Sequence, residues 1–163
     1  MQLQPIDPHD ASPLIEELDA YQSVLYPDES NHLDSIDVLR ADNVHMLGAY
    51  DDDELAGIGA IKLFQEYGEI KRVFVPPAHR GKGYAKSLMA GLEQVAAAHG
   101  LAVVRLETGI HQQQAIGLYR KLGYAECDAF GDYVADPLSV FMQKALRPNK
   151  ALQRTPLRDA AEL

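Results

Sequence analysis

The chain has 163 residues, a formal net charge of −9, and 47% hydrophobic and 24% charged residues, which suits one globular domain and is too short for two ordinary ones. The acidic balance argues against a nucleic acid as partner. No apolar run reaches the ~20 residues that span a bilayer, and the N-terminus lacks the basic and apolar regions of a signal peptide. The single cysteine cannot form an internal disulfide, which fits a reducing compartment. The sequence therefore predicts a cytoplasmic protein with no membrane partner.

Apolar periodicity and turn residues divide the chain into alternating strands and helices. Strands are expected at 3–6, 44–50, 55–64, 69–75, 101–106, 124–127 and 139–146. Helices are expected at 12–21, 33–40, 84–99 and 112–122, the first with Ser12 as N-cap and Pro13 at its first position. The 69–75 strand, the 84–99 helix and the 101–106 strand form a βαβ unit, so these two strands should be parallel. Residues 147–163 follow the last strand and read as a loosely ordered tail.

A basic loop with two glycines joins the 69–75 strand to the next helix. Pro76 and Pro77 end the strand because proline cannot donate to a sheet. Gly81 and Gly83 let the backbone turn and approach a ligand closely. The first N–H groups of the following helix lack internal partners, and the helix dipole favours an anion there. The loop also carries a cluster of basic side chains: His79, Arg80, Lys82 and Lys86. The pattern predicts a pyrophosphate-binding loop.

Two familiar phosphate-binding motifs fit this segment poorly. A P-loop needs Gly, four residues and then Gly-Lys-Ser/Thr, but Pro76 stands at the first glycine and Gly83 follows Lys82. A dinucleotide fingerprint would place Lys86 where a small residue is needed, although Glu107 lies at roughly the right distance for its acidic residue. The loop alone also leaves open an ordinary turn with solvated charges.

Sequence motifs on both sides of the loop narrow these alternatives. Arg80-x-x-Gly83-x-Ala85 is similar to a Gln/Arg-x-x-Gly-x-Gly/Ala signature, and a second motif follows at Ala115-x-x-Leu118-Tyr119-x-x-x-Gly123-Tyr124. Together with the 69–75 strand, they resemble the GNAT superfamily of acetyl-coenzyme-A-dependent N-acyltransferases. The resemblance covers roughly residues 3–146 and implies one α/β domain over 1–146. It implies a twisted, mixed sheet of about six or seven strands with helices on both faces, in which the fourth and fifth strands are parallel and splayed.

The resemblance implies acetyl-CoA as cosubstrate and assigns its contacts. It places the backbone N–H of Val73 at the thioester oxygen and Val75 on the pantetheine arm. Gln112 stands where the family often has an Asn that contacts the pantetheine or closes the strand-to-helix turn. The predicted acetyl-CoA contacts are Val73, Phe74, Val75, Arg80, Gly81, Lys82, Gly83, Tyr84, Ala85, Lys86 and Gln112. No Cys-x-x-Cys or His-Glu-x-x-His spacing predicts a metal site.

Tyr119 is the first candidate catalytic residue. It matches the tyrosine that the family commonly uses to protonate the CoA thiolate, and a thiolate leaving group needs a nearby O–H donor. The other interpretation is a core aromatic on the helix that packs against the sheet. His111 lies close to the expected acyl site in sequence and is a further candidate for a base or a substrate contact, with a loop histidine without a role as the alternative.

Glu69 is the candidate general base. It lies four residues before Val73, where the histone-acetyltransferase branch of the family has a catalytic glutamate. Strand alternation predicts Glu69, Lys71, Val73 and Val75 on one face. The alternatives are a glutamate in solvent or paired with Lys71 or Arg72, with water or another residue as base.

The expected reaction is transfer of the acetyl group to a primary amine of a small molecule or peptide. The acidic run 51–54 would favour a cationic acceptor, but the preferred interpretation of this run is a hairpin tip in solvent. The sequence does not decide between a monomer and a homodimer. The alternative function is a non-catalytic acyl-CoA-binding sensor, which would need the loop but neither proton-transfer group. Tyr119 and Glu69 together favour an enzyme.

Overall fold

A computed structural model describes residues 1–30 and 35–146. The predicted tail 147–163 and the first two residues of the predicted 33–40 helix lie outside the described residues. The strands are β1 (Gln2–Pro5), β2 (Val44–Asp51), β3 (Glu54–Leu63), β4 (Gly68–Phe74), β5 (Val103–Gly109), β6 (Ala125–Glu126) and β7 (Ser139–Ala145). The helices are α1 (Ser12–Leu25), α2 (Ile36–Leu39), α3 (Tyr84–Ala98) and α4 (Gln113–Lys121), with 3₁₀ turns η1 (Asp28–Ser30) and η2 (Pro77–His79). The predicted order of elements is confirmed.

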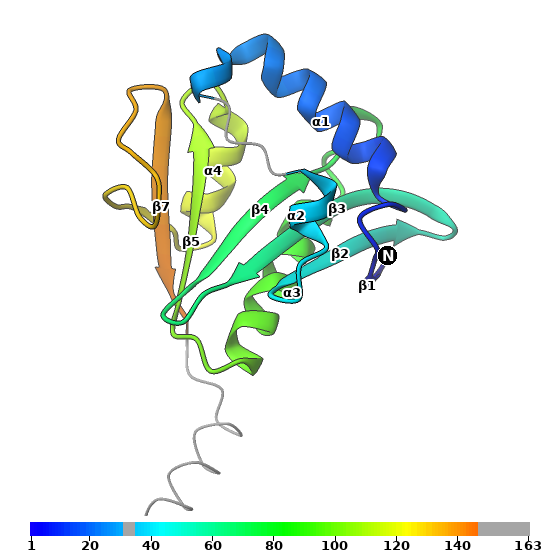
Figure 1. The fold of residues 1–163 in the computed structure, drawn as a ribbon. Coiled ribbons are helices and arrows are strands. Elements are labelled where there is room, and N and C mark those ends of the chain that lie inside the picture. Colours follow the sequence, from blue (N-terminus) through cyan, green and yellow to red (C-terminus); the bar gives the residue numbers. More distant parts are fainter. Residues whose placement is uncertain (31–34, 147–163) are drawn as a thin grey trace, which may run out of the picture.

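The strands form one seven-stranded sheet in the order β1-β2-β3-β4-β5-β7-β6. Neighbouring strands are antiparallel except β4 and β5, which are parallel as the βαβ unit predicts. The β4–β5 ladder covers only residues 68–70 of β4, whereas β5 pairs with β7 along its whole length, from Val103 to Gly109. The two parallel strands therefore separate after Ile70, and the predicted splay is confirmed (Figure 1).

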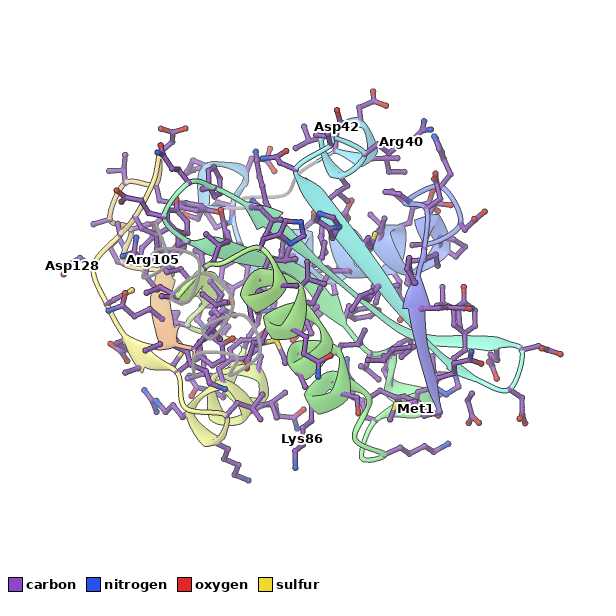
Figure 2. The ribbon with its side chains drawn as sticks, turned by 90° about the horizontal axis from the view of Figure 1, so that it is seen from below. Met1, Arg40, Asp42, Lys86, Arg105 and Asp128 are labelled. Atoms are coloured by element: carbon purple, nitrogen blue, oxygen red, sulfur yellow. The ribbon has the colours of Figure 1, made fainter. Side chains whose placement is uncertain are left out.

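Helices cover both faces of this sheet (Figure 1). On one face, α3 and α4 pack over a core cluster that includes Met89, Leu92, Leu106, Tyr119 and Met142. On the other face, α1 and α2 cover a second cluster that includes Leu14, Leu18, Leu39, Ile58 and Phe74. Figure 2, seen from below, shows α3 lying across the sheet with Lys86 pointing outward. No helix in the described part of the chain is long and apolar enough to cross a membrane.

The segment 127–138 between β6 and β7 covers part of the α1 side of the sheet. Met142 packs in the cluster beneath α3 and α4, so its neighbour Phe141 faces the opposite side. Phe130 and Tyr133 of the segment contact Phe141 through ring-edge contacts with centroids 5.7 and 5.5 Å apart. No helix is needed on this part of the sheet, because the segment supplies the aromatic cover.

Strand β4 contains a bulge. Ile58 of β3 lies opposite Phe74, but Ala60, two residues on, lies opposite Lys71, so β4 has one residue more than β3 over this stretch. Arg72 within the bulge has φ of 58°, a left-handed conformation that is uncommon for residues other than glycine. Bulges of this kind redirect the side chains that follow them.

The bulge makes the predicted alternation along β4 wrong. Glu69 and Lys71 contact Tyr133 on the α1 side of the sheet. Val73 packs against the cluster under α3, and Val75 packs against the neighbouring cluster on that side. The four side chains therefore do not share a face, because one inserted residue moves everything beyond it to the opposite face. Glu69 and Val73 approach the same region from opposite sides of the sheet.

Some element boundaries also differ from those predicted. Helix α1 starts at Ser12 with Ala11 as its N-cap and no side-chain cap, so Ser12 is not the cap residue. It continues to Leu25 instead of ending near residue 21. Strand β5 starts at Val103 and continues to Gly109 because β7 pairs with it that far, whereas the apolar run predicted 101–106. Ser35 caps α2 by accepting a hydrogen bond from the N–H of Val38.

Candidate active site

The separation of β4 from β5 leaves two cavities that meet. The inner cavity, about 60 Å³, lies between the diverging strands and includes Glu69, Lys71, Glu107, Thr108 and Tyr133 in its lining. A water molecule needs roughly 10–15 Å³ by this measure, so the inner cavity holds only a few waters or a small polar group. The long groove, about 530 Å³, follows the ends of β4 and α4. Leu18, Val73, Gln112 and Tyr119 line both.

The long groove contains many of the residues predicted to contact acetyl-CoA. It is lined by Val73, Phe74, Val75, Arg80, Ala85 and Gln112, together with Tyr119. The Nε of Arg80 donates to the carbonyl oxygen of Val75 at 2.9 Å, which fixes the side chain against the end of β4. Residues Gly81, Lys82, Gly83, Tyr84 and Lys86 do not line the groove itself and form the loop and the start of α3 next to it. The ring of Tyr84 is buried against Leu88.

The loop before α3 has the backbone geometry of an anion site. Gly81 and Gly83 have φ of 80° and 85°, and a Cβ built on either would meet no atom within 4 Å. Positive φ explains why both positions are glycine, and the open space leaves room for a ligand to approach the backbone. Gly83 is the N-cap of α3 and no side chain caps this helix, so its first N–H groups remain available to an anion. These features fit the pyrophosphate of acetyl-CoA.

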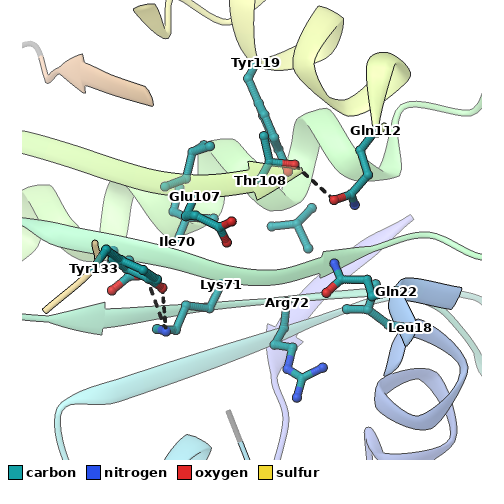
Figure 3. Close-up of a pocket in the computed structure, with 13 residues that line it drawn as sticks. Leu18, Gln22, Ile70, Lys71, Arg72, Glu107, Thr108, Gln112, Tyr119 and Tyr133 are labelled. Atoms are coloured by element: carbon teal, nitrogen blue, oxygen red, sulfur yellow. Dashed lines mark hydrogen bonds and ion pairs between the residues drawn. The ribbon is translucent and has the colours of Figure 1, made fainter. Parts of the chain in front are cut away.

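Tyr119 is placed where the two cavities meet. Its side chain is 8% exposed and its ring packs edge-on against Tyr124 at 6.0 Å between centroids. Within the described residues, no group lies at hydrogen-bond distance from its hydroxyl. Burial raises the pKa of Tyr119 to about 12, so the hydroxyl stays protonated and can donate a hydrogen bond. Tyr119 is therefore a core aromatic whose polar end faces the cavities (Figure 3), and its role as proton donor to the CoA thiolate stays a prediction.

Glu69 is buried at the other side of the inner cavity, with 4% of its surface exposed. Its Oε2 accepts a hydrogen bond from the hydroxyl of Tyr133 at 2.5 Å and lies 3.3 Å from the Nζ of Lys71. The predicted alternative of a pair with Lys71 is therefore present, whereas Arg72 pairs with Asp19 of α1. Glu69 is not in open solvent, and its carboxylate lines the cavity.

Gln112 closes the turn between β5 and α4. Its Oε1 accepts hydrogen bonds from the N–H of Gly109 at 3.0 Å and from the hydroxyl of Thr108 at 3.4 Å (Figure 3). Tyr26, which follows α1, also contacts this turn. Its hydroxyl donates to Gln112 at 3.5 Å and accepts from the N–H of His111 at 3.1 Å. The exposed His111 stacks on the Tyr26 ring and lines the long groove, not the inner cavity.

The resemblance implied only that Tyr26 is a plausible specificity residue for the acceptor, and the sequence assigned no role to Tyr133. Both lie outside the regular helices and strands, so no periodicity indicates where their side chains point. Glu107 and Thr108, near the end of β5, both line the inner cavity. No group of three or more potential metal ligands occurs among the residues that the structure describes.

Comparisons with known proteins agree with this geometry. The family model described as acetyltransferase (GNAT) family matches residues 11–124. An IAA acetyltransferase of Azospirillum brasilense is 46% identical over 135 residues, which cover 82% of this chain and 88% of that protein. The N-acetyltransferase YsnE of Bacillus subtilis, named as uncharacterized, is 37% identical over 76% of this chain and 84% of its own.

Solved structures show the same fold. A Klebsiella pneumoniae protein whose name assigns it to the acyl-CoA N-acyltransferases is 40% identical, with a TM-score of 0.76 over 90% of this chain and 97% of that chain. The PaiA N-acetyltransferase of Thermoplasma acidophilum was solved with coenzyme A and is 21% identical to this chain. Its TM-score is 0.68 over 90% of this chain and 100% of that chain, a likeness that shows the shared fold alone. The chain belongs to the GNAT family and is an N-acetyltransferase that uses acetyl-CoA as its acetyl donor.

Proposed function

We propose that the protein acetylates a primary amine of a small molecule or peptide, which reaches the acetyl group through the inner cavity. One observation carries this proposal: the Tyr119 hydroxyl, protonated and without a partner in the described residues, lies where the long groove meets the inner cavity. A thioester carried by the groove would end at this junction. An amine in the inner cavity would then face it from the opposite side.

The long groove and its loop would hold the acetyl donor. The N–H groups at the start of α3 and the basic side chains of Arg80, Lys82 and Lys86 would bind the pyrophosphate. β5 does not pair with β4 beyond Ile70, so the backbone around Val73 and Val75 is available to the acetyl carbonyl and the pantetheine. Acetyl-CoA supplies an acetyl thioester, which an amine can attack directly. A backbone N–H at the carbonyl oxygen would stabilise the negative charge that develops there.

Two side chains would move the protons. The amine nitrogen forms a bond to the acetyl carbon while the carbon–sulfur bond breaks. Glu69 accepts the proton that the amine nitrogen loses, and Tyr119 donates its hydroxyl proton to the departing sulfur. The contacts that hold Glu69 reach Oε2, so Oε1 is the oxygen that would accept the proton.

The experiment is a screen for CoA release from acetyl-CoA with amines, amino acids, polyamines and peptides. IAA belongs in the panel because a relative 46% identical to this chain is named for it. With the best acceptor, Glu69→Gln should lower turnover within the range of about 10²–10⁴-fold that acid–base groups contribute, and Tyr119→Phe should lower it by up to about 10²-fold. The Kd for acetyl-CoA should stay unchanged in both variants. Wild-type turnover in both variants would remove these roles. Failure of every amine in the panel would contradict the acceptor class.

A further inference from the structure

Tyr133 comes from a segment without regular structure, yet its position is well fixed. Its ring makes edge contacts with Phe130 and Phe141, with centroids 5.3 and 5.5 Å apart. Asp136, three residues further on, accepts a hydrogen bond from the hydroxyl of Ser30 in η1 at 2.6 Å. The segment 127–138 is thus attached to β7 on one side and to the end of the α1 region on the other.

The hydroxyl of Tyr133 is directed at the proposed base. It donates to Oε2 of Glu69 at 2.5 Å and accepts from the Nζ of Lys71 at 3.4 Å. Lys71 also pairs with the same Glu69 oxygen at 3.3 Å. Figure 3 shows the side chains of Tyr133 and Lys71 meeting at the edge of the inner cavity. Both contacts therefore converge on one oxygen and set the rotation of the carboxylate.

These three residues also separate two cavities. Glu69, Lys71 and Tyr133 line the inner cavity and also a wider outer cavity of about 1060 Å³ on the α1 side, which further includes Phe64 and Tyr67. Glu69 is 4% exposed, so its carboxylate has few solvent contacts of its own. A carboxylate held between two cavities needs fixed hydrogen-bond partners if one oxygen is to face the reacting group.

We propose that Tyr133 is a positioning residue for acetyl transfer, which acts through Glu69 by holding Oε2 so that Oε1 faces the amine. This inference rests on the proposed function, in which Glu69 accepts the amine proton. Tyr133 itself exchanges no proton with the substrate. The role belongs to the hydroxyl, because the ring has separate packing partners in Phe130 and Phe141.

The test is a double-mutant cycle measured as turnover with the best amine of the panel. Tyr133→Phe keeps the ring and removes only the hydroxyl, and should lower kcat at least about tenfold because a misplaced catalytic group loses that much or more. In the E69Q background the same substitution should change kcat less than about twofold, since the carboxylate it positions is gone. The Kd for acetyl-CoA should be unchanged throughout.

Two controls separate this effect from general damage. In the Y119F background, Tyr133→Phe should still lower kcat about tenfold, which shows that the small effect in E69Q is not a detection limit. Tyr67→Phe removes a hydroxyl from a ring that lines the outer cavity but not the inner one, and should leave kcat unchanged.

Three other results for kcat would each contradict the inference, and the pattern of the variants distinguishes them. If Tyr133→Phe alone leaves kcat unchanged while Glu69→Gln lowers it, the positioning role is wrong and the proposed function stands. If Tyr133→Phe has the same effect with and without Glu69, Tyr133 acts independently of it. If Glu69→Gln itself has no effect, the assignment of the base is wrong and the positioning role is lost with it.

Discussion

Gly83→Val tests whether the loop before α3 binds the acetyl donor. Gly83 has φ of 85°, and a Cβ there would meet nothing within 4 Å. The Cβ of a valine would therefore meet no part of the protein, so the expected cost to folding is chiefly the backbone strain, about 1–3 kcal/mol. The added side chain would occupy the space in which the pyrophosphate must approach the backbone. The variant should therefore remain folded and lose acetyl-CoA binding.

The assay is thermal unfolding with and without acetyl-CoA. At 100 times its Kd, a ligand adds about 2.7 kcal/mol to the unfolding free energy, which for a chain of this size raises Tm by roughly 5–10 °C. The wild type should show this shift at millimolar acetyl-CoA, and the Gly83→Val variant should show none. Isothermal titration would give the two affinities directly.

Gly100→Val is the matched control. Gly100 follows the other end of α3, has φ of 79° and also has nothing within 4 Å of a built Cβ. The helix has 15 residues and is about 22 Å long, so this site lies at the end of α3 opposite to Gly83. The control should lose similar stability and keep the full shift with acetyl-CoA. If Gly83→Val also keeps the shift, or Gly100→Val loses it, the assignment of the loop as the binding site is wrong.

Four further predictions concern the interior of the site and the core. Tyr119→Phe should keep the acetyl-CoA affinity and lower turnover by up to about 10²-fold in the CoA-release assay, because water can replace part of the hydroxyl's role. Burial raises the pKa of Tyr119 from 10.0 to about 12. Between pH 10 and pH 12 the hydroxyl is therefore deprotonated in the unfolded chain and protonated in the folded one, so the unfolding free energy falls as the pH rises. Urea unfolding should be measured between pH 10 and pH 12 for the wild type and for Tyr119→Phe. Per pH unit, the unfolding free energy of the wild type should fall by up to about 1.4 kcal/mol more than that of the variant. Gly109→Ala would place a Cβ 1.8 Å from the Tyr26 hydroxyl, so it should cost about 1–3 kcal/mol in urea unfolding, and an unchanged stability would contradict this packing. Leu92→Ala removes a side chain with 0% exposure from beneath α3 and should cost about 2–5 kcal/mol, measured in the same way.

The arrangement of the elements could be predicted because local signals decide it. The apolar face of α3, the acidic turn between β2 and β3 and the prolines after β4 each determine where an element begins or ends. The parallel β4–β5 pair followed from the handedness of βαβ connections. The length of β5 did not follow, because Glu107 and Thr108 look like a polar end of a strand. They remain in the strand because β7 pairs with them, and such a pairing is not visible in local sequence.

The site was predictable where backbone chemistry defines it and not where long-range contacts do. Gly81 and Gly83 could be assigned because only glycine adopts their conformation readily. The bulge at Arg72 could not, since nothing in the run from Glu69 to Val75 marks an inserted residue, and the faces of the later side chains were consequently wrong. Tyr133 lies far from Glu69 in the sequence, so only the folded chain brings the two together.

The short ladder between β4 and β5 divides the sheet into two parts that share backbone hydrogen bonds only at residues 68–70. At the open end, side chains connect the parts instead: Tyr133 to Glu69, Ser30 to Asp136, and Tyr26 to the turn at Gln112. Two of these contacts come from the segment 127–138. The width of the opening that admits the donor thus depends on a segment next to the expected path of the acceptor. A deletion in that segment that removes both contacts should therefore also alter the affinity for acetyl-CoA, whereas loss of the Tyr133 hydroxyl alone leaves the Ser30–Asp136 and Tyr26 contacts in place.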